Sequence, residues 1–201
     1  MTLYRLMARS RDADACWRRA RRGSASRNPV YRSGETWRPS KPQVPGLHDF
    51  DFLVGHWQVH HRRLKERLAE QPASGSSSRA RRSCRRSWTA TRLVDDNVLD
   101  FPPGAYRAAG LRAFDVKSGQ WSIWWLDSRM PLGPMDPPVS GSFQDGTGTF
   151  LADETFNGIP IRVRFTWSAI TPTSCHWEQA FSTDGGATWE TNWVMDFERI
   201  R

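Results

Sequence analysis

The clearest fold signal in this chain is the stretch FDFLVGHW at residues 50–57, an apolar run that ends in Gly-x-Trp. Gly55 lets the backbone turn tightly, and Trp57 supplies a large ring that can plug the closed end of a β-barrel. Apolar and polar residues then alternate weakly over 56–68, as expected for a strand, although 62–70 also fits a helix. The stretch therefore predicts the entry into a first strand.

Short strand-like segments and tight turns follow through residues 93–200. The cleanest strand is 159–167, where apolar residues alternate with polar and basic ones. Asp145-Gly146 and Asn157-Gly158 are the pairs that two-residue hairpins need for positive φ. At about 8 to 12 residues per strand, we predict an all-β domain, an antiparallel up-and-down sheet closed into a barrel. Further strands are expected at 105–116, 120–129, 139–143, 150–156, 175–182 and 189–199.

The net charge of +8 is distributed unevenly over the 201 residues. Residues 1–45 carry eleven Arg or Lys against three acidic residues, and residues 71–92 carry six Arg and no acid. Residues 93–201 have a net charge of −6. No period of 2 or 3.6 is sustained over the first segment, so we expect a disordered Arg-rich tail at 1–46 and one barrel domain at 47–201.

The Ser- and Arg-rich segment 71–92 interrupts the alternation on either side of it. A barrel needs a strand or two here, yet the segment is poor strand material, with Trp88 as its only large apolar residue. We expect an anomalous insert or loop. Its composition also suggests that compensating insertions and deletions have put this stretch out of frame, a hypothesis that a folded strand at 79–88 would contradict.

The two ends of the expected domain resemble the calycin barrels. In those proteins a late arginine stacks over the tryptophan of a first-strand Gly-x-Trp, and Gly55, Trp57 and Arg199 stand at the matching positions here. Such a pair would close the bottom of the barrel by a cation–π contact of about 0.5–2 kcal/mol. The resemblance implies a structural role for these three residues.

Residues 50–57, 121–129 and 184–193 are similar to uncharacterised bacterial lipocalin-like proteins that are described as domains of unknown function. The similarity covers about 47–66 and 94–197. It implies a calycin-type barrel, and it implies no established activity.

Residues 182–189, STDGGATW, also fit the Asp-box pattern Ser-x-Asp-x-Gly-x-Thr-Trp of sialidase propeller blades. In that pattern the Asp caps a hairpin turn and the Trp packs beneath it. A propeller would need repeated copies, and the sequence has one. We therefore interpret Asp184, Gly186 and Trp189 as the residues of a structural turn.

The eleven tryptophans are the unusual feature of the composition. They predict either a cavity with aromatic walls for a flat or apolar small molecule or a filled, narrow core. On the cavity interpretation, four tryptophans and a few convergent polar groups would form the ligand site. The predicted ligand-binding residues are Trp121, Trp124, Trp125, Asp127, Arg129, Glu178, Asn192 and Trp193.

Other kinds of chemistry have weaker support. There is neither a Gly-x-Ser-x-Gly nor a readable Cys/His pair, and the dispersed histidines and cysteines indicate no metal site, so we assign no catalytic or metal-binding residue. An enzyme that uses acid–base carboxylates in the same cavity is the alternative, with candidates Asp127, Asp153, Glu154, Glu178 and Glu190.

The expected partner is a small molecule, and the sequence identifies no cofactor. Nucleic-acid binding through the Arg-rich tail is a further alternative. We favour the simpler interpretation that the tail is solvated and binds no nucleic acid. No apolar run has the length of a membrane span or of a signal-peptide core, which favours a cytoplasmic protein. We expect a monomer or a homodimer.

Overall fold

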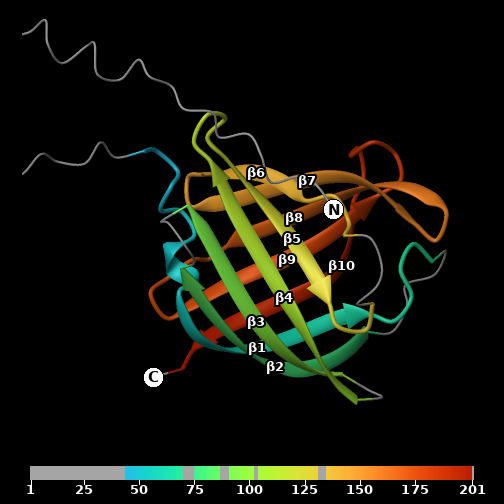
Figure 1. Ribbon diagram of the computed structural model, residues 1–201. Coiled ribbons are helices and arrows are strands. Elements are labelled where there is room, and N and C mark those ends of the chain that lie inside the picture. The colour runs from blue at the N-terminus through green and yellow to red at the C-terminus, as the bar shows by residue number, and fades with distance from the viewer. Residues whose placement is uncertain (1–43, 70–74, 87–90, 102–103, 131–134, 201) are drawn as a thin grey trace, which may run out of the picture. The chain divides into compact units, whose positions relative to one another are not determined.

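The computed structural model describes residues 44–69, 75–86, 91–101, 104–130 and 135–200. Ten antiparallel strands form a closed barrel in which each strand is hydrogen-bonded to the next in the chain, and β1 also pairs with β10 (Figure 1). The predicted all-β up-and-down barrel is therefore confirmed. The strands are β1 (Gly55–Leu64), β2 (Gly75–Arg86), β3 (Arg92–Phe101), β4 (Gly104–Asp115), β5 (Gln120–Asp127), β6 (Val139–Gln144), β7 (Thr147–Phe156), β8 (Ile159–Ser168), β9 (Ser174–Ser182) and β10 (Glu190–Arg199).

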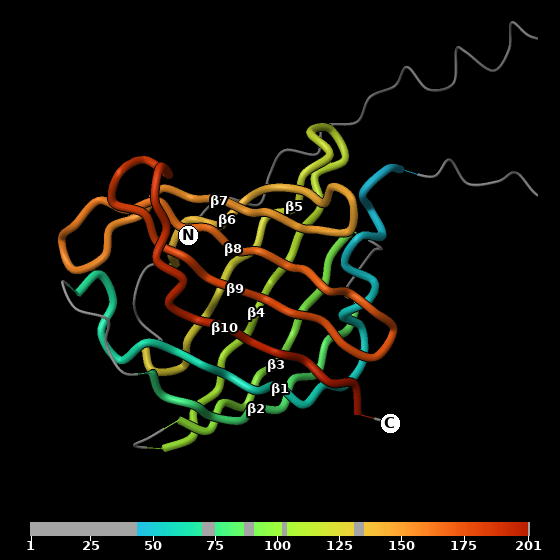
Figure 2. The backbone as a smooth tube through the Cα atoms, turned by 180° about the vertical axis from the view of Figure 1, so that it is seen from behind, coloured from blue at the N-terminus to red at the C-terminus, as the bar shows by residue number. Residues whose placement is uncertain are grey.

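The alternation of residue types sets which side chains face the barrel interior. On β1, Trp57, Val59 and His61 are buried, as their shared face predicts. The tight turns follow the sequence as well, because Asp145 and Asn157 both have a φ of 50° and each is followed by a glycine with positive φ. Figure 2 shows β8, β9, β10, β1 and β2 side by side along one wall.

The segment expected as an insert or loop contains strand β2, which corrects that expectation. Gly75–Arg86 pairs with both β1 and β3, and its inward residues include Ala80, Arg82 and Cys84. The alternation was hidden because one inward position holds an arginine, which a charge partner on β3 makes tolerable. The strand covers residues 79–86 of the range 79–88 named above, so this part of the segment speaks against the out-of-frame hypothesis. Residues 71–74 and 87–90 lie outside the described residues.

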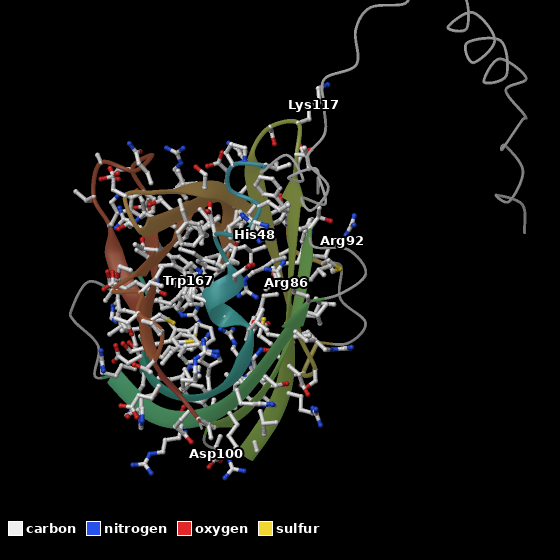
Figure 3. The ribbon with its side chains drawn as sticks, turned by 90° about the vertical axis from the view of Figure 1, so that its left-hand side faces the viewer. His48, Arg86, Arg92, Asp100, Lys117 and Trp167 are labelled. Atoms are coloured by element: carbon white, nitrogen blue, oxygen red, sulfur yellow. The ribbon has the colours of Figure 1, made fainter. Side chains whose placement is uncertain are left out.

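One end of the barrel is closed by a short 3-10 helix, η1 (Asp51–Leu53), and the residues around it. Phe50 has no exposed surface, and its ring makes edge contacts with Trp121, Phe143 and Trp167. In Figure 3, Trp167 lies among the side chains inside the barrel, whereas Lys117 lies at the outer tip of the β4–β5 turn. Aromatic side chains therefore pack closely together at the η1 end.

Arg199 holds the same end together. Its guanidinium carbon lies 4.2 Å from the centre of the Trp57 ring, and its nitrogens donate hydrogen bonds to the carbonyl oxygens of Phe52 (2.6 Å), Val54 (2.8 Å) and Pro172 (2.7 Å). Gly55 has a φ of 128° and lies directly against Arg199, so a side chain there would be both strained and obstructed. One arginine thus joins the start of β1 to the end of β10.

The turn between β9 and β10 is closed by its own side chains. Asp184 accepts hydrogen bonds from the Ser182 hydroxyl (2.7 Å) and from the backbone N–H (2.9 Å) and hydroxyl (2.6 Å) of Thr188, and these bonds lower the pKa of Asp184. The Trp189 indole N–H donates to the Gly186 carbonyl oxygen at 2.9 Å.

Among the described residues, no helix is long and apolar enough to cross a membrane.

Candidate functional site

A cavity of about 510 Å³ lies inside the barrel at the end away from η1. Its volume falls within the range of about 300–1,000 Å³ that is typical of small-molecule sites. Eight aromatic residues line the cavity, together with aliphatic side chains, five arginines and three acidic residues. The aromatic lining residues are Tyr106, Trp125, Phe156, Phe165, Trp167, Trp177, Phe181 and Trp193.

The floor of the cavity carries a buried cluster of charges. Asp95, on β3, has no exposed surface and accepts from Arg112 of β4 at 2.8 Å, and its carboxylate lies 3.1 Å from a guanidinium nitrogen of Arg82 on β2. Burial alone would raise the pKa of Asp95, but Arg112 and Arg82 together hold it below its usual value. We call these three residues the buried triad.

Neighbouring residues fix the geometry of the buried triad. Arg82 Nε donates to the side-chain oxygen of Asn97, whose amide in turn donates to the Ala108 carbonyl oxygen at 3.2 Å. Asp95 pairs with Gly110 across the β3–β4 ladder, and a Cβ at residue 110 would overlap the Asp95 carboxylate. The close approach of β4 to the carboxylate therefore requires a glycine.

A second charged group lies nearer the open end. Arg129 forms a two-pronged ion pair with Asp127, with N–O distances of 2.9 and 2.6 Å, and its guanidinium carbon lies 3.7 Å from the centre of the Tyr106 ring. Burial would raise the pKa of Asp127, but the Arg129 hydrogen bonds lower it. This pair presents a fixed polar surface to one side of the cavity.

The wall formed by β1 and β10 combines a cation with an indole. The guanidinium carbon of Arg63 lies 4.6 Å from the centre of the Trp193 ring. Behind it, the Trp193 indole N–H donates to His61 Nδ1 at 3.0 Å. Burial lowers the pKa of His61 to about 3, so this histidine is a neutral acceptor that orients Trp193. Burial likewise lowers the pKa of Arg63.

Four of the eight predicted ligand-binding residues line the cavity together: Trp125, Asp127, Arg129 and Trp193. Glu154, a candidate carboxylate of the enzyme alternative, lines it as well. The rings of Trp125 and Trp193 meet edge-on, with centroids 6.1 Å apart. The four ligand-binding residues come from β5, from the turn after it, and from β10, so the barrel joins segments that are more than sixty residues apart in the chain.

The other four lie elsewhere. Trp121 packs into the closed end and donates to the Gly46 carbonyl oxygen at 2.9 Å, and Trp124 is on the opposite face of β5 from Trp125. Glu178 is on the outer face, 3.0 Å from a ring nitrogen of His176, and Asn192 is buried against Gln179 rather than on the cavity wall. Ligand binding by any of the eight residues stays a prediction.

Sequence reasoning predicted Arg129 and missed the other four arginines of the cavity, Arg63, Arg67, Arg82 and Arg112. Arg63 shares a face of β1 with Trp57 and His61, so the alternation did place it inside the barrel. Arg112 and Asp95 likewise occupy inward positions on strands whose other inward residues are mostly apolar. The sequence did carry a signal for them, because each charged residue stands at an alternating position on the same face as apolar residues of its strand.

Fold and cavity together define a barrel of calycin type with an arginine-rich interior. A similar fold occurs in the S-type phycobiliprotein lyase CPES from Guillardia theta, with a TM-score of 0.52 and 12% identity over 80% of this chain and 99% of the lyase. Rv2717c from M. tuberculosis aligns with a TM-score of 0.54 and 9% identity over 78% of this chain and 98% of its own. At such identities the likeness shows the fold alone.

No protein-family model and no curated protein matches the chain. Membership in the bacterial lipocalin-like family therefore stays a prediction, as do the cytoplasmic location and the monomeric or dimeric state. Residues 1–43, on which a nucleic-acid partner would depend, lie outside the described residues. Within the described ranges, no three His, Cys, Asp or Glu side chains lie close enough together to hold a metal ion.

Proposed function

We propose that this protein binds a small, partly apolar molecule inside its barrel. The observation that carries the proposal is the cavity of about 510 Å³, whose wall combines aromatic rings and aliphatic side chains with charged groups. A core that merely filled itself would leave no space of this size, because protein interiors pack to nearly crystalline density. Small-molecule binding is also the role that the barrel fold and the aromatic composition favour.

The chemistry of the wall suits a flat or aromatic ligand. Trp125 and Trp193 supply ring faces and edges, and Tyr106 and Arg129 form a stacked pair beside them. Aromatic pairs contribute about 0.5–1.5 kcal/mol beyond the area that they bury. Asp127 is held in an ion pair with Arg129, which favours a role in orienting the ligand over that of a free catalytic base.

A fluorescence titration tests the proposal. Haem, fatty acids, flavins and aromatic metabolites are each added to the protein, and saturable quenching of tryptophan emission reports binding. We expect at least one ligand class to bind with one-to-one stoichiometry. Absence of saturable quenching across the whole panel would contradict the proposal.

Two neighbouring tryptophans on β5 give the matched variants. Trp125→Ala removes a ring from the cavity wall, so the affinity for the bound ligand should fall at least tenfold. Trp124→Ala removes a ring from the outer face of the same strand and should change the affinity less than twofold. Equal losses in both variants would place the ligand outside the cavity.

A further inference from the structure

Three buried hydrogen-bond donors on residues of the cavity floor have no acceptor among the described residues. They are Nη1 of Arg82, Nε of Arg112 and the indole Nε1 of Trp167. A buried donor without a partner costs about 1–3 kcal/mol, and more when it belongs to a charged group. Most buried polar groups in proteins are satisfied, so three such donors in one place require an explanation.

The three donors belong to one cluster. Both guanidinium groups contact the same oxygen of Asp95, at 3.1 Å from Arg82 and 2.8 Å from Arg112. The guanidinium carbon of Arg112 lies 5.6 Å from the centre of the Trp167 ring. Unpartnered donors from β2, β4 and β8 therefore belong to side chains that line one cavity.

The charge of the buried triad points to the same kind of group. Two guanidinium groups share one carboxylate, which leaves a net charge of +1 in a region where the side chains are almost fully buried. Arginine remains protonated in proteins, so this charge persists at neutral pH. An uncompensated buried charge is costly unless a counter-charge reaches it.

We propose that the cavity floor is an anion site and that the ligand enters with a carboxylate group directed at Arg82, Arg112 and Trp167. The inference rests on the proposed function, since it names the chemical class of the molecule held in the barrel. A carboxylate supplies acceptors for all three donors and balances the charge of the triad. Guanidinium–carboxylate hydrogen bonds are among the strongest in proteins, and they also fix orientation.

The remainder of such a ligand would meet a different surface. Trp125, Trp177 and Trp193 stand on the wall above the floor, with edge contacts between Trp193 and each of the other two. The ligand class is therefore an aromatic or apolar carboxylic acid. Arg112 and Trp167 lie outside the unusual segment 71–92, so two of the three donors do not depend on its composition.

A pair of matched probes tests the inference. 1-Pyrenebutyric acid and 1-pyrenebutanol share ring and chain and differ only in the carboxylate. Energy transfer from tryptophan to pyrene at neutral pH reports the binding of each. We expect the acid to bind the wild-type protein at least tenfold more tightly than the alcohol.

Three variants locate the effect. Arg112→Met and Arg82→Met each remove one donor group and should bring the acid-to-alcohol affinity ratio close to one, while the affinity for the alcohol stays within about twofold. Retained binding of the alcohol shows that the variant is folded. Arg107→Met, on the outer face of β4, is the matched control and should keep the wild-type ratio.

The outcomes separate the two proposals. Equal binding of acid and alcohol to the wild type would overturn the anion site, leaving its donors to ordered water, while the ligand cavity stands. A preference for the acid that survives both Arg112→Met and Arg82→Met would also overturn it. Failure of both probes to bind would contradict the proposed function together with the inference that rests on it.

Discussion

Asp95 and Gly110 face each other across the β3–β4 ladder, and the Asp95 carboxylate occupies the position where a side chain at residue 110 would begin. This contact allows one buried carboxylate to serve two arginines that arrive from the strands on either side. It also lets the barrel hold charge at its centre while its closed end remains apolar.

Gly110→Ala should therefore destabilise the protein by about 3 kcal/mol or more, since a Cβ would displace the carboxylate and uncouple the buried triad. Gly104→Ala, on the same strand, is the control, because a Cβ there meets nothing within 4 Å. Urea unfolding of both variants measures the difference. Similar free energies of unfolding for the two variants would mean that the close approach of residue 110 to the Asp95 carboxylate does not require a glycine.

Asp95→Asn should cost about 3–5 kcal/mol, because it leaves two buried guanidinium groups without a counter-charge. Asp96→Asn changes the neighbouring residue, which pairs with Arg107 on the exposed face, and should cost no more than about 1 kcal/mol. Thermal unfolding of the two variants compares them. A larger loss for Asp96→Asn would contradict the claim that Asp95 supplies the counter-charge for two buried arginines.

Arg199→Leu should lower the free energy of unfolding by about 2–4 kcal/mol, because the variant loses the stacking on Trp57 and the hydrogen bonds to three carbonyl oxygens. Arg199→Lys keeps the charge but lacks the planar fork, so it should recover only part of this stability. Denaturant unfolding tests the series. Full recovery by lysine would show that charge alone matters.

His61 gives a pH dependence with a defined sign. Its pKa is about 3 in the folded barrel, because burial disfavours the charged ring, against about 6.5 in the unfolded chain. Between these values only the unfolded chain binds the proton, so this contribution to stability is complete above pH 6.5 and declines as the pH falls.

His61→Gln keeps an acceptor for the Trp193 indole and removes the titration. The stability of the wild type relative to this variant should therefore decrease between pH 8 and pH 4.5. Urea unfolding at the two pH values measures it, and other titrating groups cancel in the comparison. A difference that is independent of pH would contradict the buried neutral state of His61.

Local pattern was enough to predict the barrel, since strands such as β8 alternate cleanly and the Asp145 and Asn157 turns carry their own backbone signal. It failed at β2, where an inward arginine is acceptable only because Asp95, thirteen residues later, faces the same interior. A partnership between strands is not visible in the composition of either strand alone.

The candidate site divides in the same way. Trp121 and Trp125 share a face of β5, but four residues of strand separate them by about 13 Å, which puts one in the closed end and the other in the cavity. Trp124 is adjacent to Trp125 and faces the other way. The types of residue predicted an aromatic interior. The position of each tryptophan between the closed end and the cavity could not be predicted, because it depends on where the barrel closes.

Native mass spectrometry tests most directly whether the barrel is a binding protein. The gently purified protein is examined alone and after incubation with the ligand panel. The cavity predicts a one-to-one adduct that survives gentle ionisation, disappears on unfolding and is weakened in Trp125→Ala but not in Trp124→Ala. Bare protein under every condition, with no retained small molecule, would contradict a ligand-binding function for the cavity.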